Sequence, residues 1–225
     1  MHHLRTLLTR WLILLTAIIL SISLLPAQSV SAAGYVVNSI ADPGDGTCDA
    51  SCTFRDAILA ANASASNDTI TFSVNGTITL ASNLPNPTNN GTLTITGNGT
   101  TNTIIDGGGA FRSLFSISAA SVNLTVQNLQ AAHGFLAGSG FGGALDIDST
   151  GGVITLNGVL FTNGEAGYGG GINIDAGTIN INNSIISDNG AYDGGGIANA
   201  GALVVNDSTI TGNSSIGTNE FGGGI

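Results

Sequence analysis

The amino-acid sequence predicts an all-β fold: a single-stranded parallel β-helix, or solenoid, of about six coils with an N-terminal amphipathic capping helix. Glycine clusters, each followed by an apolar residue, recur with spacings of 27, 25 and 28 residues. They begin at Gly142, Gly169, Gly194 and Gly222. A repeat period between about 20 and 50 residues is typical of solenoids and other repeat arrays.

A second sequence marker keeps the same step as the glycine clusters. It is an apolar residue three places before an Asn, and it recurs with spacings of 26 and 24 residues. The apolar residues are Leu160, Ile186 and Ile210. Asn tolerates left-handed backbone, and its amide can bond to an identical amide one coil away. We therefore expect Asn163, Asn189 and Asn213 to form a ladder; His133 holds the corresponding turn position one coil earlier.

Each repeat unit reads as strands rather than helices. The units are rich in Gly, Asn, Thr, Ile and Val, which are poor helix formers. Apolar residues recur at every second position, as at Ile172 and Ile174 or at Leu203 and Val205. Because every coil runs the same way round, strands in successive coils are expected to pair in parallel about 4.8 Å apart.

The chain divides into three predicted parts. Arg5 and Arg10 precede an apolar run at residues 11–25 and then a stretch of small residues, which is the layout of a cleaved signal peptide over residues 1–33. The alternative, a membrane anchor, needs a longer run of about 20 residues. Residues 34–68 are expected to hold a strand and the capping helix. Residues 69–225 form the β-helix, which we expect to be truncated at its C-terminal end.

The predicted capping helix follows the only two cysteines. Its apolar residues recur at helical spacing, at Phe54, Ala57, Ile58 and Ala61. Arg55 lies in the same helix. Ser51 or Thr53 can cap the N-terminus of this helix, and Asp56 lies in its first turn. In an exported chain Cys48 and Cys52 favour a disulfide; the alternative is half of a metal site.

The segment CTFRDA, residues 52–57, resembles the C-S-L-R-E-A signature of the CSLREA domain, with Phe54 in place of Leu and Asp56 in place of Glu. That domain introduces bacterial secreted or surface proteins with right-handed parallel β-helix repeats. The glycine and Asn markers are similar to the GGA(I/L) and FxxN repeats of chlamydial polymorphic outer membrane proteins. The resemblance covers roughly residues 34–225 and implies right-handed winding, an outer-membrane or cell-surface location and an adhesin-like role.

Charge narrows the possible partners. Only 8% of the residues are charged, none is Lys, and the formal net charge is −10. Such a chain repels nucleic acid and anionic lipid, so we expect neither as a partner. The mature chain is also expected to contain no direct membrane span.

The best candidate for chemistry is an acidic patch. Asp146 and Asp148 point outward from one strand about 6.5–7 Å apart, and the glycine alignment places Asp175 one coil away. These carboxylates can bind Ca²⁺ or can serve as acid and base of an inverting hydrolase, and no other cofactor is expected. The third interpretation is that they are only solvated. Arg112 is expected to be a solvated, outward residue of a strand.

Together these features predict a secreted or cell-surface protein without catalytic activity, adhesin-like or structural, that binds glycans or surface proteins. The alternative is a carbohydrate-active enzyme, a polysaccharide lyase or glycoside hydrolase, of the same fold. Ice binding is not expected, because Thr-x-Thr pairs such as Thr69/Thr71 and Thr94/Thr96 do not recur at the coil period of the sequence.

Overall fold

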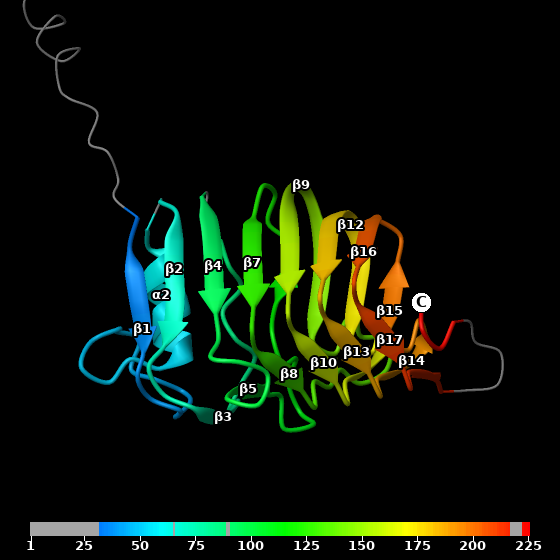
Figure 1. The fold of residues 1–225 in the computed structure, drawn as a ribbon, viewed down its shortest axis with the longest axis horizontal. Helices are drawn as coiled ribbons and strands as arrows, with labels where there is room; N and C mark the ends of the chain where they lie inside the picture. Colours follow the sequence, from blue (N-terminus) through cyan, green and yellow to red (C-terminus); the bar gives the residue numbers. More distant parts are fainter. Residues whose placement is uncertain (1–31, 65, 89–90, 217–221) are drawn as a thin grey trace, which may run out of the picture. The chain divides into compact units, whose positions relative to one another are not determined.

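The computed structural model describes residues 32–64, 66–88, 91–216 and 222–225, and this part of the chain winds into a parallel β-solenoid of about six coils (Figure 1). Every strand pairing among the described residues is parallel. The predicted signal peptide lies almost wholly outside the described residues. Within them, no helix is long and apolar enough to cross a bilayer.

The strands form three sheets. The first sheet contains β1 (Gly34–Val37), β2 (Asp68–Phe72), β4 (Thr92–Thr96), β6 (Ser116–Ile117), β7 (Asn123–Gln127), β9 (Leu145–Asn157), β12 (Ile172–Asn182), β15 (Ile197–Asn199) and β16 (Ala202–Asn206). The second sheet contains β3 (Gly76–Thr79), β5 (Thr103–Asp106), β8 (Gln130–Ala132), β10 (Leu160–Thr162), β13 (Ile185–Ser187) and β17 (Thr209–Thr211). The third sheet contains β11 (Glu165–Tyr168), β14 (Gly190–Asp193) and β18 (Ser214–Ser215).

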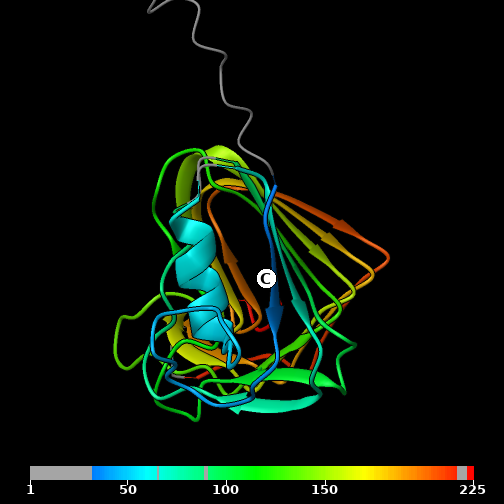
Figure 2. The same cartoon turned by 90° about the vertical axis from the view of Figure 1, so that its left-hand side faces the viewer.

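The solenoid winds to the right. Figure 2 looks along its axis from the N-terminal end. The chain runs up through β15, down through β16, and follows this clockwise path as the coils recede from the viewer. This is the handedness expected for crossovers between parallel strands.

Inward side chains form apolar columns that explain the alternating sequence. In the second sheet Ile105 pairs with Ala131, Ala131 with Phe161, and Phe161 with Ile186. All four are at most 1% exposed. Equivalent inward positions must carry apolar residues in every coil, because each one packs on the coil before and the coil after it.

Glycine recurs at the start of each glycine cluster for a steric reason. Gly169 has φ +60°, and a Cβ at this position would lie 2.0 Å from the carbonyl oxygen of Ile172. Ile172 pairs with Leu145 on one side and Ile197 on the other, so the glycine alignment gives the correct register.

The alignment by the second marker is wrong by one residue in one coil. Leu160 pairs with Ile185, and Phe161 is the partner of Ile186. Phe161 is buried and fills the inward column, whereas Leu160 is only partly buried. Both residues are apolar, so hydropathy alone does not show which one faces the core.

The predicted helix is present as α2 (Phe54–Asn62), and Thr53 is its N-cap. The Thr53 hydroxyl accepts a hydrogen bond from the Asp56 N–H at 3.2 Å, and the Asp56 carboxylate accepts one from the Thr53 N–H at 3.0 Å. The apolar face is fully buried and consists of Phe54, Ala57, Ile58 and Ala61. The Phe54 ring lies 5.4 Å from that of Phe72 in β2. That α2 caps the solenoid core stays a prediction.

Arg55 projects from the same helix into a dense set of contacts. Its Nε and Nη2 donate to the two carboxylate oxygens of Asp42 at 2.8 and 2.9 Å. Its Nη1 and Nη2 also donate to the carbonyl oxygens of Asn83 and Ser82, each at 2.8 Å. Two nitrogens on one carboxylate form the planar, bidentate pairing that guanidinium favours. Arg55 therefore joins α2 to the loop that follows β3.

The two cysteines form the predicted disulfide. The sulfur atoms of Cys48 and Cys52 are 2.02 Å apart, and the bridge lies just before α2.

Candidate functional site

The acidic patch is only partly assembled. Asp146 pairs with Asn173 across the β9–β12 register, and its Oδ1 accepts a hydrogen bond from the Asn173 amide at 3.0 Å. Its Oδ2 accepts one from the Ser116 hydroxyl at 2.9 Å and lies 3.4 Å from Arg112 Nη2. Asp146 is therefore part of a polar network rather than an open ligand.

Asp175 does not lie beside Asp148, contrary to the glycine alignment. The register shifts after Ile174, so that Asp148 pairs with Ala176 and Asp175 is the extra residue of an irregular stretch. The described residues contain no group of three or more His, Cys, Asp or Glu side chains placed to hold a metal ion. A β-bulge adds one residue to one strand and cannot be recognised from an alignment of two repeats.

Arg112 is not the solvated strand residue that its sequence position predicts. It lies before β6, and its side chain is 12% exposed. Nε donates to the carbonyl oxygen of Gly142 at 2.9 Å, and Nη2 donates to that of Phe141. Burial lowers the pKa of this guanidinium below its usual value, and the nearby Asp146 carboxylate offsets only part of that shift. Arg112 thus secures the turn that carries Phe141.

The Asn ladder has two members. The Asn189 amide is buried and donates to the Asn213 Oδ1 at 2.9 Å and to the Phe161 carbonyl oxygen at 3.1 Å. Its own Oδ1 accepts a hydrogen bond from the Gly164 N–H at 2.8 Å. Asn163 is outside the ladder. The register of β10 and β13 places Gly164, rather than Asn163, opposite Asn189.

An acidic partner for His133 is present in the fold but was not evident in the sequence. His133 has φ +47°, which agrees with the turn position predicted for it. Its Nδ1 lies 3.1 Å from the Asp106 Oδ2. The residue before His133, Ala132, pairs with Asp106 across β8 and β5. The pair is 27 residues apart in sequence, so only the coil register brings it together.

The outer face of the first sheet carries two straight columns of uncharged polar side chains. One column is Thr69, Thr94, Thr125, Thr155 and Asn180. The other is Thr71, Thr96, Gln127, Asn157, Asn182 and Asn206. Side chains bond along the second column, as from the Gln127 amide to the Thr96 hydroxyl at 2.9 Å and from the Asn206 amide to Asn182 at 3.0 Å.

The threonine pairs do recur from coil to coil, contrary to the expectation from the sequence. Thr69 and Thr71 do stack on Thr94 and Thr96, and Thr125 follows in the next coil. The steps from Thr69 through Thr94 and Thr125 to Thr155 are 25, 31 and 30 residues. Loops of different length between strands conceal this recurrence, although the strands themselves are in perfect register.

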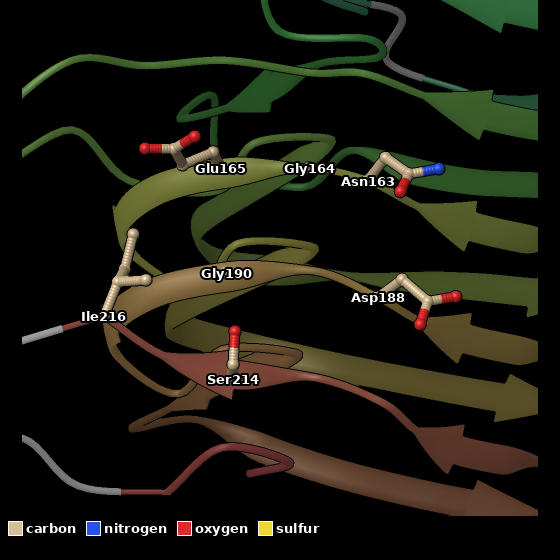
Figure 3. Close-up of a pocket in the computed structure, with 7 residues that line it drawn as sticks. All are labelled: Asn163, Gly164, Glu165, Asp188, Gly190, Ser214 and Ile216. Carbon is tan, nitrogen blue, oxygen red and sulfur yellow. The ribbon is translucent and has the colours of Figure 1, made fainter.

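A groove lies on the third sheet and the adjoining turns, with a volume of about 330 Å³ (Figure 3). Asn163 and Asp188 line one side, Glu165 and Ile216 line the other, and Gly190 and Ser214 lie between them. A second hollow of about 210 Å³ shares Glu165 and Ile216 with the groove and continues past Tyr192 to Phe135. No motif of the amino-acid sequence points to this groove.

Three aromatic side chains are exposed on this side of the solenoid, and one of them, Tyr192, lines the second hollow. The rings of Phe141 and Tyr168 stack with centroids 5.3 Å apart and an interplanar angle of 19°. Tyr192 follows on the next strand, where its neighbour Asp193 pairs with Tyr168. The exposed fractions of Phe141, Tyr168 and Tyr192 are 41%, 38% and 47%, and these are the exposed aromatic residues of the described chain.

No family model, no curated protein and no solved structure matches this chain. The resemblance to the CSLREA domain and to polymorphic outer membrane proteins therefore stays a prediction. Two surfaces of the described chain remain as candidates for function: the uncharged columns of the first sheet, and the groove of the third sheet with its aromatic rings.

Proposed function

We propose that the chain is a secreted or cell-surface β-solenoid that works as a binding surface, adhesin-like and without catalytic activity. The observation that carries the proposal is the pair of outward columns on the first sheet, in which no side chain is charged although the formal net charge is −10. Hydroxyl and amide groups repeated every 4.8 Å or so offer many weak contacts to an extended partner.

The contacts of three carboxylates argue against a catalytic role for these three side chains. Asp42 is paired with Arg55, Asp56 caps α2, and Asp146 bonds to Asn173 and Ser116. A hydrolytic pair needs one carboxyl held as an acid and a second one open to water and substrate. These three side chains instead hold neighbouring segments together.

The test is binding of the purified chain to immobilised glycans, to surface proteins and to intact cells. We expect Thr125→Asp, which introduces a charge into the middle of the first column, to lower binding about tenfold. Thr209→Asp adds the same charge on the second sheet and serves as the matched control. Equal binding by both variants and the parent chain would contradict the proposal.

Catalysis is tested separately. We expect no turnover of polyuronates or neutral glycans in the presence of calcium. Turnover that disappears in Asp148→Asn would instead favour the carbohydrate-active enzyme.

The threonine column favours a second candidate function, binding to an ice surface. In a tetrahedral water network, two oxygens that share a neighbour at about 2.75 Å lie about 4.5 Å apart. Successive strands are about 4.8 Å apart, so the four stacked threonines from Thr69 to Thr155 nearly match this repeat. Threonine is also restricted at χ1, which keeps its methyl and hydroxyl groups in place.

Thermal hysteresis and inhibition of ice recrystallisation test this candidate. Ice binding predicts activity in the parent chain that Thr94→Asp abolishes and Thr209→Asp leaves unchanged. A parent chain without either activity removes ice binding and leaves the adhesin-like proposal standing.

A further inference from the structure

We propose that the groove of the third sheet, together with the rings of Phe141, Tyr168 and Tyr192, binds a neutral oligosaccharide. The inference rests on the proposed binding function and names a ligand class for one site. It differs from the broad contacts of the first sheet, because the groove is concave and the hollow that adjoins it is lined by the aromatic residues Phe135 and Tyr192.

The shape of the groove fits a short, linear ligand. The two hollows, of about 330 and 210 Å³, meet at Glu165 and Ile216. The larger one alone reaches the lower end of the range of about 300–1,000 Å³ that is usual for small-ligand sites. A sugar chain lying along the strands would run from the polar groove past Glu165 and Ile216 to the side of Tyr192.

The aromatic rings fit the apolar face of a pyranose. An aromatic ring carries partial negative charge on its face, which attracts the partly positive C–H groups of a sugar. The exposed aromatic residues of the described chain are all on this side of the solenoid, in three neighbouring coils. Stacking holds Phe141 and Tyr168 together, and Arg112 bonds to the backbone of Phe141, so this platform is already ordered.

The polar side chains fit the hydroxyl groups. Glu165 and Asp188 present carboxylates, Asn163 an amide and Ser214 a hydroxyl, and Figure 3 shows them around one hollow. A carboxylate accepts hydrogen bonds from two adjacent sugar hydroxyls with its two oxygens, and an amide can both donate and accept.

Charge selects among glycans. The residues that line the two hollows include Glu165 and Asp188 but no Arg, Lys or His. Bringing a uronate or sialate carboxylate beside these two acids costs electrostatic energy without any compensating cation. The groove therefore favours neutral sugars over acidic ones.

Gly190 keeps the groove open. It pairs with Glu165 on one side and Ser214 on the other, so its missing side chain leaves a notch between theirs. A Cβ at Gly190 would lie 3.7 Å from the Ile216 Cδ1 and 3.8 Å from the Ser214 Oγ, which is ordinary contact. A larger residue at this position would fill the groove without straining the coil.

The test is calorimetric titration of the full chain with hexasaccharides of β-glucan, α-glucan, mannan and galacturonan. We expect at least one neutral hexasaccharide to bind with an affinity that 1 M NaCl does not weaken, and galacturonan not to bind. Tyr192→Ala and Tyr168→Ala should each weaken binding about tenfold, and Gly190→Leu should abolish it.

Matched controls separate loss of binding from loss of folding. Val153→Ala removes an exposed apolar side chain from the first sheet, and Gly34→Val adds a side chain there at a glycine whose Cβ would make only ordinary contact, 3.5 Å from the Thr69 Oγ1. Both should bind like the parent chain, and all variants should keep the parent thermal midpoint.

The proposal is overturned if no neutral hexasaccharide binds, if galacturonan binds better, or if folded Gly190→Leu binds like the parent. Its failure is distinguishable from failure of the proposed function. If the groove binds nothing while Thr125→Asp still impairs attachment to cells or surfaces, only the groove inference is lost. If neither surface shows binding, both proposals are lost.

Discussion

The side chain of Asn189 is expected to be one of the strongest single contributors to the stability of the later coils. Asn189→Ala removes three hydrogen bonds: to the Phe161 carbonyl, to the Asn213 amide and from the Gly164 N–H. Asn189 is 1% exposed, so water cannot replace these bonds. At about 1 kcal/mol for each bond, and with buried groups left unpaired, the substitution should cost about 3–4 kcal/mol.

Asn163 provides the matched control. It makes one hydrogen bond, to the Thr162 hydroxyl at 3.2 Å, and has φ +55°. Asn163→Ala should cost about 1 kcal/mol, mostly because alanine disfavours left-handed backbone. Urea unfolding followed by circular dichroism measures both values. With a slope of about 2 kcal/mol per M, Asn189→Ala should lower the midpoint by about 1.5–2 M and Asn163→Ala by about 0.5 M.

The result that would refute this reasoning is an equal effect of the two substitutions. Equal losses would mean that Asn163 belongs to the ladder after all and that Leu160, rather than Phe161, aligns with Ile186. A small effect of both would mean that the amide ladder contributes little beyond what backbone pairing already supplies.

Three further predictions concern the stability contributed by a turn glycine, by the buried face of α2 and by the disulfide. Gly169→Ala should lower the unfolding free energy by at least about 2 kcal/mol, since the new Cβ meets the Ile172 carbonyl oxygen at 2.0 Å and φ is +60°. Gly34→Ala should be nearly neutral, because its Cβ would make only ordinary contact with the Thr69 Oγ1 at 3.5 Å. Phe54→Ala should cost about 3–5 kcal/mol by chemical denaturation, and an unchanged stability would argue against α2 as a cap. Replacing Cys48 and Cys52 by Ser should cost only about 2 kcal/mol in the same measurement, because the closed loop is short, and a loss above 4 kcal/mol would contradict the chain-entropy argument.

The sequence was informative where a single coil carries its own signal. The glycine clusters gave the correct alignment of Leu145, Ile172 and Ile197, because each cluster begins with a glycine whose conformation excludes a side chain. Alternation of apolar residues predicted the strands. Helical spacing and an N-cap sequence predicted α2 within the bounds that the structure shows.

The sequence was less informative where a feature depends on two coils at once. Asp175 was misplaced because the register shifts after Ile174, and Arg112 was misread because its partners lie in the turn at Gly142 and Phe141. Neither a bulge nor a contact with a distant backbone carbonyl leaves a pattern in the residues themselves.

By itself, then, the amino-acid sequence determined the repeat, the strands, the single helix of the described chain and the acidic, weakly charged surface. Only the tertiary structure decided which side chains lie side by side: the stacked threonines, the Asn189–Asn213 pair, the stacked rings of Phe141 and Tyr168, and the hollow that Tyr192 lines with Glu165. The physical reason is that backbone hydrogen bonds between coils set the register, while the intervening loops vary in length. Residues 24 to 31 places apart therefore become neighbours in a way that no fixed period predicts.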